Sequence, residues 1–509
     1  MSKPVLLSLA LAFYASAAMA EPGAAPAVDP ARLAHHVSVL ASDAYEGRQP
    51  GTPGERLTLS YISGQMRDAG LAPAAEGGWY QPVRLIAYVP KAASLTAVRT
   101  KRAIPASDLA LAGPNPAVRL RRAPLVFAGY GLPSQLPQDG SLKGAVALYL
   151  PDAPKAGAPG RLPDGDARRK AMRAAGAAAA IAIVEDGSWE GNAQRFAPGL
   201  TRLGDQPLDM VRGIIRRFAA QSLAGDGRDG LDALTAEAAQ PGFVARRIGG
   251  TVDLVTETEV RRFTSWNVAG LLPGATRPEE TVLVTAHWDH LGICRPDGVP
   301  DRICNGAVDN ASGVAGLIEM ARMLAQGDRP DRSILFLATT AEEMGLLGAR
   351  AYARRPLAPL GKTVAALNLD TIALRPAGSP VAVVGRGLSS IDPIVATAAA
   401  AQGRTVFSGN GPNAFIERSD AFAFVEAGVP AVIATGVLAS PPGPNDGLLD
   451  GFFRDRYHKP SDEPGPQVDF SGAAEDVGLN VAIARRLGDS ATNVEWLAAS
   501  PYQRAGATH

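Results

Sequence analysis

Three short apolar runs in the C-terminal half of the chain each lead into side chains of the metal-ligand type, and this pattern constrains the fold most strongly. The runs and the side chains that follow them are residues 281–286 with His287, residues 332–338 with Glu342 and Glu343, and residues 363–369 with Asp370. Continuous apolar runs of this length are typical of strands that are buried on both faces of a sheet. Because open α/β sheets place ligands at the carboxyl ends of their strands, we expect the three strand ends to meet at one edge.

Two further candidate ligands complete the set. Asp309 lies just before residues 314–325, whose apolar positions follow helical spacing, and His458 stands in the sequence Tyr-His-Lys-Pro. Two imidazoles and three carboxylates suit zinc or a similar divalent ion, not copper(I) or an iron–sulfur cluster. Five ligands are too many for one tetrahedral ion, but they are what two ions would need if Asp309 bridged them.

In their order along the chain these blocks resemble the co-catalytic di-zinc exopeptidases of the bacterial leucyl aminopeptidase, aminopeptidase Y and glutamate carboxypeptidase type. The resemblance implies two Zn²⁺ per chain, one held by His287 and Asp370 and the other by Glu343 and His458, with Asp309 between them. It extends to residues 40–43, 46–52 and 418–420. In this chain Ala421 stands where many relatives have His, so a substrate contact usual in that family is expected to be missing.

Glu342 and Asp289 are the candidate catalytic residues. The resemblance implies that Glu342 is the general base, and Glu342 fits this role because its neighbour Glu343 can bind a metal while Glu342 points into the cleft. Asp289 stands two residues after His287 and can accept the second N–H of that imidazole. His290 is the alternative to His287 as a metal ligand. We favour His287 as the ligand and place His290 at the rim of the site or beside the ligands.

Each of these residues has a simpler interpretation when it is considered alone. The pair Glu342 and Glu343 is also typical of a solvated helix start, His458 of a surface loop, and Asp370 of a helix cap. The order of the blocks and their placement after apolar runs favour the metal site. No His-Glu-x-x-His or Gly-x-Ser-x-Gly motif occurs, which argues against a single-zinc protease helix and against a serine hydrolase.

Composition agrees with a soluble secreted enzyme but does not specify one. The chain has 509 residues, of which 46% are hydrophobic, and its 50 basic and 50 acidic residues cancel, so nothing suggests binding to nucleic acid or to a membrane surface. Residues 1–20 have the parts of a cleavable signal peptide, with a membrane anchor as the alternative. We therefore expect a periplasmic or secreted protein that is free of the membrane after cleavage and binds peptide substrates. The sequence leaves the oligomeric state open.

The two cysteines lie in one loop between candidate ligands. Cys294 and Cys304 are ten residues apart, and an oxidising compartment would allow them to form a disulfide. A role as extra zinc ligands is the alternative.

The expected fold class is α/β, with a phosphorylase/hydrolase-like mixed sheet covered by helices on both faces and an inserted, smaller α/β domain. The insert resembles a protease-associated domain, and a plain second α/β domain is the alternative. The expected divisions of the chain are a signal peptide (1–20), a linker (21–29), an N-terminal part of the peptidase domain (30–89), the insert (90–250), the metal-bearing part (251–488) and a C-terminal tail (489–509).

The function favoured by these observations is an exported zinc aminopeptidase that releases single residues from peptide N-termini. A carboxypeptidase or another amide hydrolase on the same centre is the first alternative, and it would need basic side chains to bind a carboxylate. The candidates for that role are Arg418, Arg454, Arg456 and Lys459. A non-catalytic binding ectodomain is the second alternative, and the intact ligand set and Glu342 argue against it.

Overall fold

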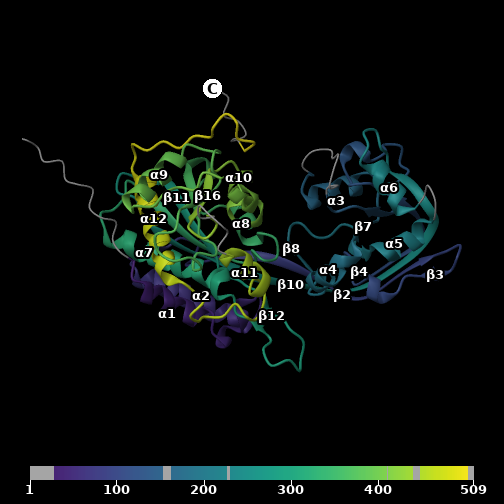
Figure 1. Ribbon diagram of the computed structural model, residues 1–509, viewed down its shortest axis with the longest axis horizontal. Helices are drawn as coiled ribbons and strands as arrows, with labels where there is room; N and C mark the ends of the chain where they lie inside the picture. Colours follow the sequence, from purple (N-terminus) through teal and green to yellow (C-terminus); the bar gives the residue numbers. More distant parts are fainter. Residues whose placement is uncertain (1–27, 153–161, 226–229, 410, 440–446, 503–509) are drawn as a thin grey trace, which may run out of the picture.

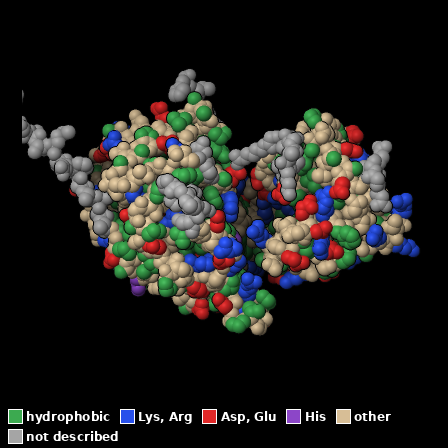
Figure 2. Space-filling view, viewed as in Figure 1, with side chains coloured by type: hydrophobic (Ala, Val, Ile, Leu, Met, Phe, Trp, Pro, Cys, Tyr) green, Lys and Arg blue, Asp and Glu red, His purple; other side chains and the backbone are tan. Residues whose placement is uncertain are grey.

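The computed structural model describes residues 28–152, 162–225, 230–409, 411–439 and 447–502. The expected signal peptide, most of the expected linker and the last seven residues of the expected tail lie outside these ranges. None of the described helices is long and apolar enough to cross a bilayer. Figure 1 shows two lobes side by side, and Figure 2 shows a hollow between them with lysine and arginine side chains along its walls.

Two long strands run through both lobes. They are β2 (Tyr80–Ala97) and β10 (Arg246–Leu272), and they pair with each other in antiparallel fashion over most of their length. The register of this pairing shifts between Glu257 and Thr258. We use this irregularity as the border and call residues 91–257 the small lobe and the other described residues the large lobe. The expected domain borders after residues 89 and 250 fall inside these two strands, so the lobes share a continuous backbone ladder.

The large lobe contains most of the helices. Its helices are α1 (Pro30–Leu40), α2 (Pro53–Asp68), α7 (Ser312–Gln326), α8 (Leu347–Arg354), α9 (Asp392–Ala401), α10 (Ala421–Glu426), α11 (Leu448–Asp455) and α12 (Phe470–Gly488). Its further strands are β1 (Ala72–Pro73), β11 (Arg277–His287), β12 (Gly292–Ile293), β13 (Ile303–Cys304), β14 (Arg332–Thr339), β15 (Thr363–Asn368), β16 (Ala382–Val384) and β17 (Ala431–Thr435).

The small lobe is also α/β. Its helices are α3 (Gly165–Ala174), α4 (Trp189–Phe196), α5 (Arg217–Ala224) and α6 (Leu231–Ala238). Its strands, besides parts of β2 and β10, are β3 (Arg102–Ala103), β4 (Leu109–Ala112), β5 (Ala117–Phe127), β6 (Val146–Tyr149), β7 (Ala179–Val184), β8 (Leu200–Leu203) and β9 (Val211–Arg216).

Fifteen of the described strands form one mixed sheet. Its main path runs β16-β17-β15-β11-β14-β10-β5-β6-β7-β9-β4. In the large lobe β11 is parallel to both β14 and β15, and β15 is parallel to β17. The α/β fold class with a mixed sheet and helices on both faces is therefore confirmed.

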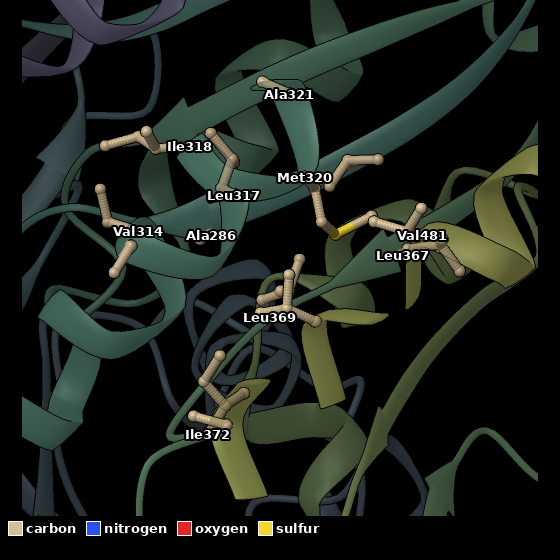
Figure 3. Packing of buried hydrophobic residues seen from close by; sticks show 14 of the residues in the cluster. Ala286, Val314, Leu317, Ile318, Met320, Ala321, Leu367, Leu369, Ile372 and Val481 are labelled. Atoms are coloured by element: carbon tan, nitrogen blue, oxygen red, sulfur yellow. The ribbon is translucent and has the colours of Figure 1, made fainter. Parts of the chain in front are cut away.

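The large-lobe sheet is covered on both faces because its strands are apolar on both sides. Along β14, Ile334 and Phe336 belong to one buried cluster, and Leu335 and Leu337 belong to another on the opposite face. The first cluster packs against α7 and α12, and Figure 3 shows side chains of both helices beside those of the strands. Each fully buried Leu or Ile of this kind contributes roughly 1.5–3 kcal/mol of hydrophobic free energy. This packing holds the carboxyl ends of the central strands rigidly in place.

The start of α7 abuts the end of β15. Asn310 accepts a hydrogen bond from the Gly313 amide (2.9 Å) and donates one to the Leu369 carbonyl (3.0 Å). A side chain at position 313 would meet the same two groups, because a Cβ atom there would lie 2.2 Å from Asn310 Oδ1 and 2.5 Å from Leu369 O. The turn that carries Asp309 is thus fixed against the strand end that carries Asp370.

Candidate metal centre

The parallel strands bring the predicted ligands to one edge of the sheet. His287 is the last residue of β11, Glu342 and Glu343 follow β14, and Asp370 follows β15. These strands run in the same direction, so their carboxyl ends lie together. Asp309 joins them from the turn before α7.

Asp309 lies between two groups of side chains. Its Oδ1 atom is 3.4 Å from His287 Nε2, which is itself 3.6 Å from Asp370 Oδ1. Its Oδ2 atom is 3.3 Å from His458 Nε2, which is 3.0 Å from Glu343 Oε2. The structure therefore brings all five predicted ligands together, and each oxygen of Asp309 faces a different imidazole.

The donor set fits two metal ions. Ligand atoms within 4.8 Å of one another occur in the group of His287, Glu342 and Asp370 and in the group of His290, Asp309 and Glu343. Several carboxylates lie within the same buried volume, where they repel one another unless positive charge is added. Imidazole nitrogens and carboxylate oxygens are the ligands that zinc uses.

His290 competes with His458 for a place in the second group. His290 Nδ1 is 2.8 Å from Glu343 Oε1, and the Nε2 atoms of both His290 and His458 are buried without a hydrogen-bond partner among the described residues. A ligand must direct one nitrogen at the same point as the other ligands. His458 Nε2 does this, because it lies near oxygens of both Asp309 and Glu343. We therefore favour His458 as the ligand and His290 as a neighbour that orients Glu343.

The electrostatic field of the centre is strongly negative. Burial lowers the pKa of His287, but the carboxylates of Glu342, Asp309 and Asp370 oppose this effect and hold the pKa well above its usual value. Burial and the carboxylate of Glu343 raise the pKa of Glu342 well above its usual value, although His287 acts in the other direction. Cations at the ligand positions would offset both effects and leave Glu342 ionised, as a general base must be.

Asp289 does not contact His287 in the way the sequence suggested. The Nδ1 atom of His287 is 3.1 Å from the main-chain oxygen of Asp289 and 3.9 Å from its carboxylate. The carboxylate instead accepts hydrogen bonds from the amides of Glu342 (3.0 Å) and Glu343 (3.4 Å). The tautomer of His287 is therefore fixed by the backbone, while the Asp289 side chain orients the two glutamates, and the expected contact was wrong in this detail.

Asp462 is a buried residue of the site that the sequence reasoning did not single out. Its carboxylate accepts hydrogen bonds from the amides of Val308 (3.2 Å) and Asp309 (3.0 Å) and pairs with Arg456 at 3.0 Å. It thereby fixes the backbone of the Asp309 turn. An acidic residue four positions after His458 was the available signal.

A pocket opens beside the centre. Its polar floor consists of His287, Asp309, Glu342 and Asp370, and its apolar walls include Phe415, Ile433, Leu438, Leu449, Phe453 and Tyr457. Arg418 also lines the pocket; its side chain is exposed, and its Nη2 atom lies 3.4 Å from the Tyr457 hydroxyl. The other predicted carboxylate-binding candidates, Arg454, Arg456 and Lys459, are not among the lining residues of this pocket. Ala421, where many relatives carry His, is buried at the start of α10 in an apolar cluster.

The two cysteines form a disulfide. Cys294 and Cys304 are joined across the β12–β13 hairpin, which confirms the expected pairing and excludes the alternative of extra zinc ligands.

Comparisons with known proteins agree with this geometry. Mouse (Mus musculus) aminopeptidase NAALADL1 is 34% identical over 143 residues, which are 26% of this chain and 18% of that protein. A probable glutamate carboxypeptidase VP8 of Zea mays is 29% identical over 163 residues, which are 31% of this chain and 20% of that protein. The matches therefore span only about a fifth of the length of these relatives.

A solved structure shares the fold over nearly the whole chain. The aminopeptidase from Aneurinibacillus sp. strain AM-1 superposes with a TM-score of 0.56 and 20% identity, covering 90% of this chain and 93% of that one. Residues 267–476, which carry all five candidate ligands, match the description Peptidase family M28. Through residues 267–476 the chain is therefore similar to peptidase family M28.

Proposed function

We propose that the protein is an exported di-zinc aminopeptidase that releases single residues from the N-termini of peptides. The observation that carries this proposal is the position of Asp309, whose two oxygens lie 3.4 Å from His287 Nε2 and 3.3 Å from His458 Nε2. A carboxylate in this position suits a bridge between two ions, with His287 and Asp370 on one ion and Glu343 and His458 on the other. Two zinc ions would supply the Lewis acidity that activates a water molecule and polarises the scissile carbonyl.

We propose that Glu342 is the general base that transfers a proton during hydrolysis. It is buried, it lines the pocket, and its backbone amide is held by the Asp289 carboxylate at 3.0 Å. In this role Glu342 accepts a proton from the attacking water and delivers it to the nitrogen of the leaving amine. A positioned carboxylate of this kind typically contributes 10²–10⁴-fold in rate.

The pocket supports recognition of a peptide N-terminus. The carboxylates of Glu342, Asp309 and Asp370 form its floor and suit an α-ammonium group. The apolar walls suit an apolar or aromatic side chain on the first residue of the peptide. We therefore expect substrates whose N-terminal residue is large and apolar.

A carboxypeptidase remains the second candidate because of one observation. Arg418 lines the same pocket and is a guanidinium that could bind a substrate carboxylate. Its exposed position at the rim, against an acidic floor, favours the aminopeptidase.

We also propose that the small lobe is an inserted protease-associated-like domain and that the chain is exported. The first proposal is supported by the chain order, since the small lobe interrupts the large one. The second is supported by the Cys294–Cys304 disulfide, which is typical of oxidising compartments.

The test is hydrolysis of aminoacyl arylamides by the zinc-replete protein. We expect turnover of leucyl and phenylalanyl arylamides with a free α-amine and loss of nearly all turnover when the amine is acetylated. Equal rates on free and acetylated substrates, or release of residues from the C-terminus of a peptide, would refute the aminopeptidase and leave a metallopeptidase of different specificity.

A further inference from the structure

Arg48 lies far from the predicted ligands in sequence but is fully buried beside them. Its side chain has an exposed fraction of 0%, and it donates hydrogen bonds only to main-chain carbonyl oxygens among the described residues. Nε donates to Trp288 (2.8 Å), Nη1 donates to Leu40 (2.8 Å) and Asn305 (2.6 Å), and Nη2 donates to Gly306 (2.9 Å).

Three of these four acceptors belong to the segments that carry the metal ligands. Trp288 directly follows His287, and Asn305 and Gly306 stand shortly before Asp309. The guanidinium is a planar fork with donors in fixed directions, so one side chain sets the spacing of the two segments. A lysine at this position would keep the charge but lose the fork.

The charge of Arg48 interacts with acidic residues of the metal centre, but none of the described carboxylates pairs with it directly. Burial lowers the pKa of Arg48 to about 10, and the carboxylates of Asp309, Asp462 and Asp289 oppose this effect, so the side chain stays charged at neutral pH. Arg404 is also buried, but it pairs directly with Asp476 at 2.8 Å. A buried cation without such a partner is costly, unless its charge is balanced by a wider group of acidic residues.

The backbone around Arg48 is held in an unusual conformation. Glu46, Gly47 and Arg48 have φ angles of 48°, 59° and 50°, which all lie in the left-handed region. Side-chain-bearing residues adopt this region at a cost, and surrounding contacts must maintain it. Here the turn aims the Arg48 side chain into the interior.

We propose that Arg48 is a positioning residue of the metal centre, which fixes the His287 and Asp309 segments at the spacing that two zinc ions require and balances part of their acidic surroundings. This role rests on the zinc centre proposed above. It predicts that changes at Arg48 alter zinc binding itself and not only the stability of the fold.

The experiment compares Arg48→Lys and Arg48→Gln with a matched control, Arg168→Lys. Arg168 is a buried arginine of the small lobe that likewise donates to main-chain oxygens, those of Tyr130, Leu150 and Pro151. Zinc affinity is measured by competition with a chelating dye, and the zinc-induced rise in Tm is measured by calorimetry on the full chain.

We expect zinc affinity to fall at least about tenfold in Arg48→Lys and further in Arg48→Gln, as is usual when a residue that supports metal ligands is lost. The zinc-induced rise in Tm should shrink in the same order. Arg168→Lys should lower Tm while its zinc affinity stays that of the wild type. If the Arg48 variants fold only when zinc is present, the zinc concentration needed for folding measures their loss of zinc affinity instead.

Two results would overturn the role of Arg48. One is wild-type zinc affinity in both Arg48 variants, whatever their Tm. The other is failure of both variants to fold at every zinc concentration while Arg168→Lys folds, because Arg48 would then be a structural residue. A wild-type protein without any zinc-induced rise in Tm would instead refute the zinc centre, and zinc binding without arylamide turnover would refute only the aminopeptidase.

Discussion

Each lobe contains a cluster of charged side chains, partly buried in the small lobe and mostly buried in the large lobe, and the two clusters differ in the sign of their excess charge. In the small lobe Asp166 contacts three guanidiniums, those of Arg169 (2.6 Å), Arg212 (2.8 Å) and Arg202. In the large lobe the carboxylates of Asp309, Glu343 and Asp370 share two imidazoles. In the first cluster three guanidiniums surround one carboxylate, so positive charge is in excess, whereas the second cluster has an excess of negative charge that metal ions would offset.

The pKa values of the carboxylates follow this difference. Burial tends to raise the pKa of Asp166, but Arg169, Arg202 and Arg212 hold it far below its usual value. At the metal centre burial and neighbouring acids raise the pKa of Glu342. The partly buried carboxylate of Asp166 and the buried one of Glu342 can therefore be separated into a structural and a functional one by the charge that surrounds them.

The largest effect is expected at His287. His287→Ala should remove at least one zinc equivalent and nearly all activity, because it takes away an imidazole that faces both Asp309 and Asp370. His290→Ala should keep both zinc ions and change mainly rate or KM, since His290 contacts Glu343 through a single nitrogen. Metal analysis of the two purified variants is the measurement. The opposite pattern of zinc loss would make His290 the ligand.

The next effect is expected at the glutamate pair. Glu342→Gln should keep two zinc equivalents while kcat falls by at least about 10²-fold, because proton transfer is lost and the ligands remain. Glu343→Gln is the matched control and should lose zinc. Zinc analysis beside steady-state kinetics checks both variants. Loss of zinc in Glu342→Gln would reverse the roles of the two residues.

The smallest effect on activity is expected in the small lobe. Asp166→Asn should lower the free energy of unfolding by about 2–3 kcal/mol at pH 7, because charge-assisted hydrogen bonds to three arginines are lost. Zinc content and kcat should not change. A fall in kcat with the protein fully folded would show that the two clusters are coupled.

The pH dependence of that stability has a definite sign. The pKa of Asp166 is lowered in the folded protein, so its stabilising effect is complete above the unfolded value of about 3.9 and is lost as pH falls below it. The difference in unfolding free energy between wild type and Asp166→Asn should therefore shrink below about pH 4. Urea unfolding at several pH values measures it, and a difference that stays constant would contradict this explanation.

Much of the large lobe could be predicted because its pattern is local. Apolar runs ending at His287 and Asp370 mark buried parallel strands, and parallel strands place their ends together whatever the detailed packing. The spacing of residues 314–325 likewise predicted the helix that became α7. These features depend on neighbours in sequence, which a single chain displays.

The remainder depends on contacts between distant segments. Arg48 is the last residue of a short 3-10 helix (Asp43–Arg48), and an arginine would ordinarily be taken as exposed; only the folded chain brings it to Trp288 and Asn305. The Asp289 carboxylate was assigned to His287 from spacing alone, but the backbone of Asp289 makes that contact. The passage of β10 through both lobes was not foreseen, because a strand of 27 residues is far longer than usual.

The most direct test of the two-ion centre is anomalous diffraction from crystals of the zinc-replete protein. We expect two zinc peaks about 3.5–4 Å apart, one beside each oxygen of Asp309, with His287 and Asp370 at one peak and Glu343 and His458 at the other. A single peak, or a second peak coordinated by His290 in place of His458, would contradict the proposed centre.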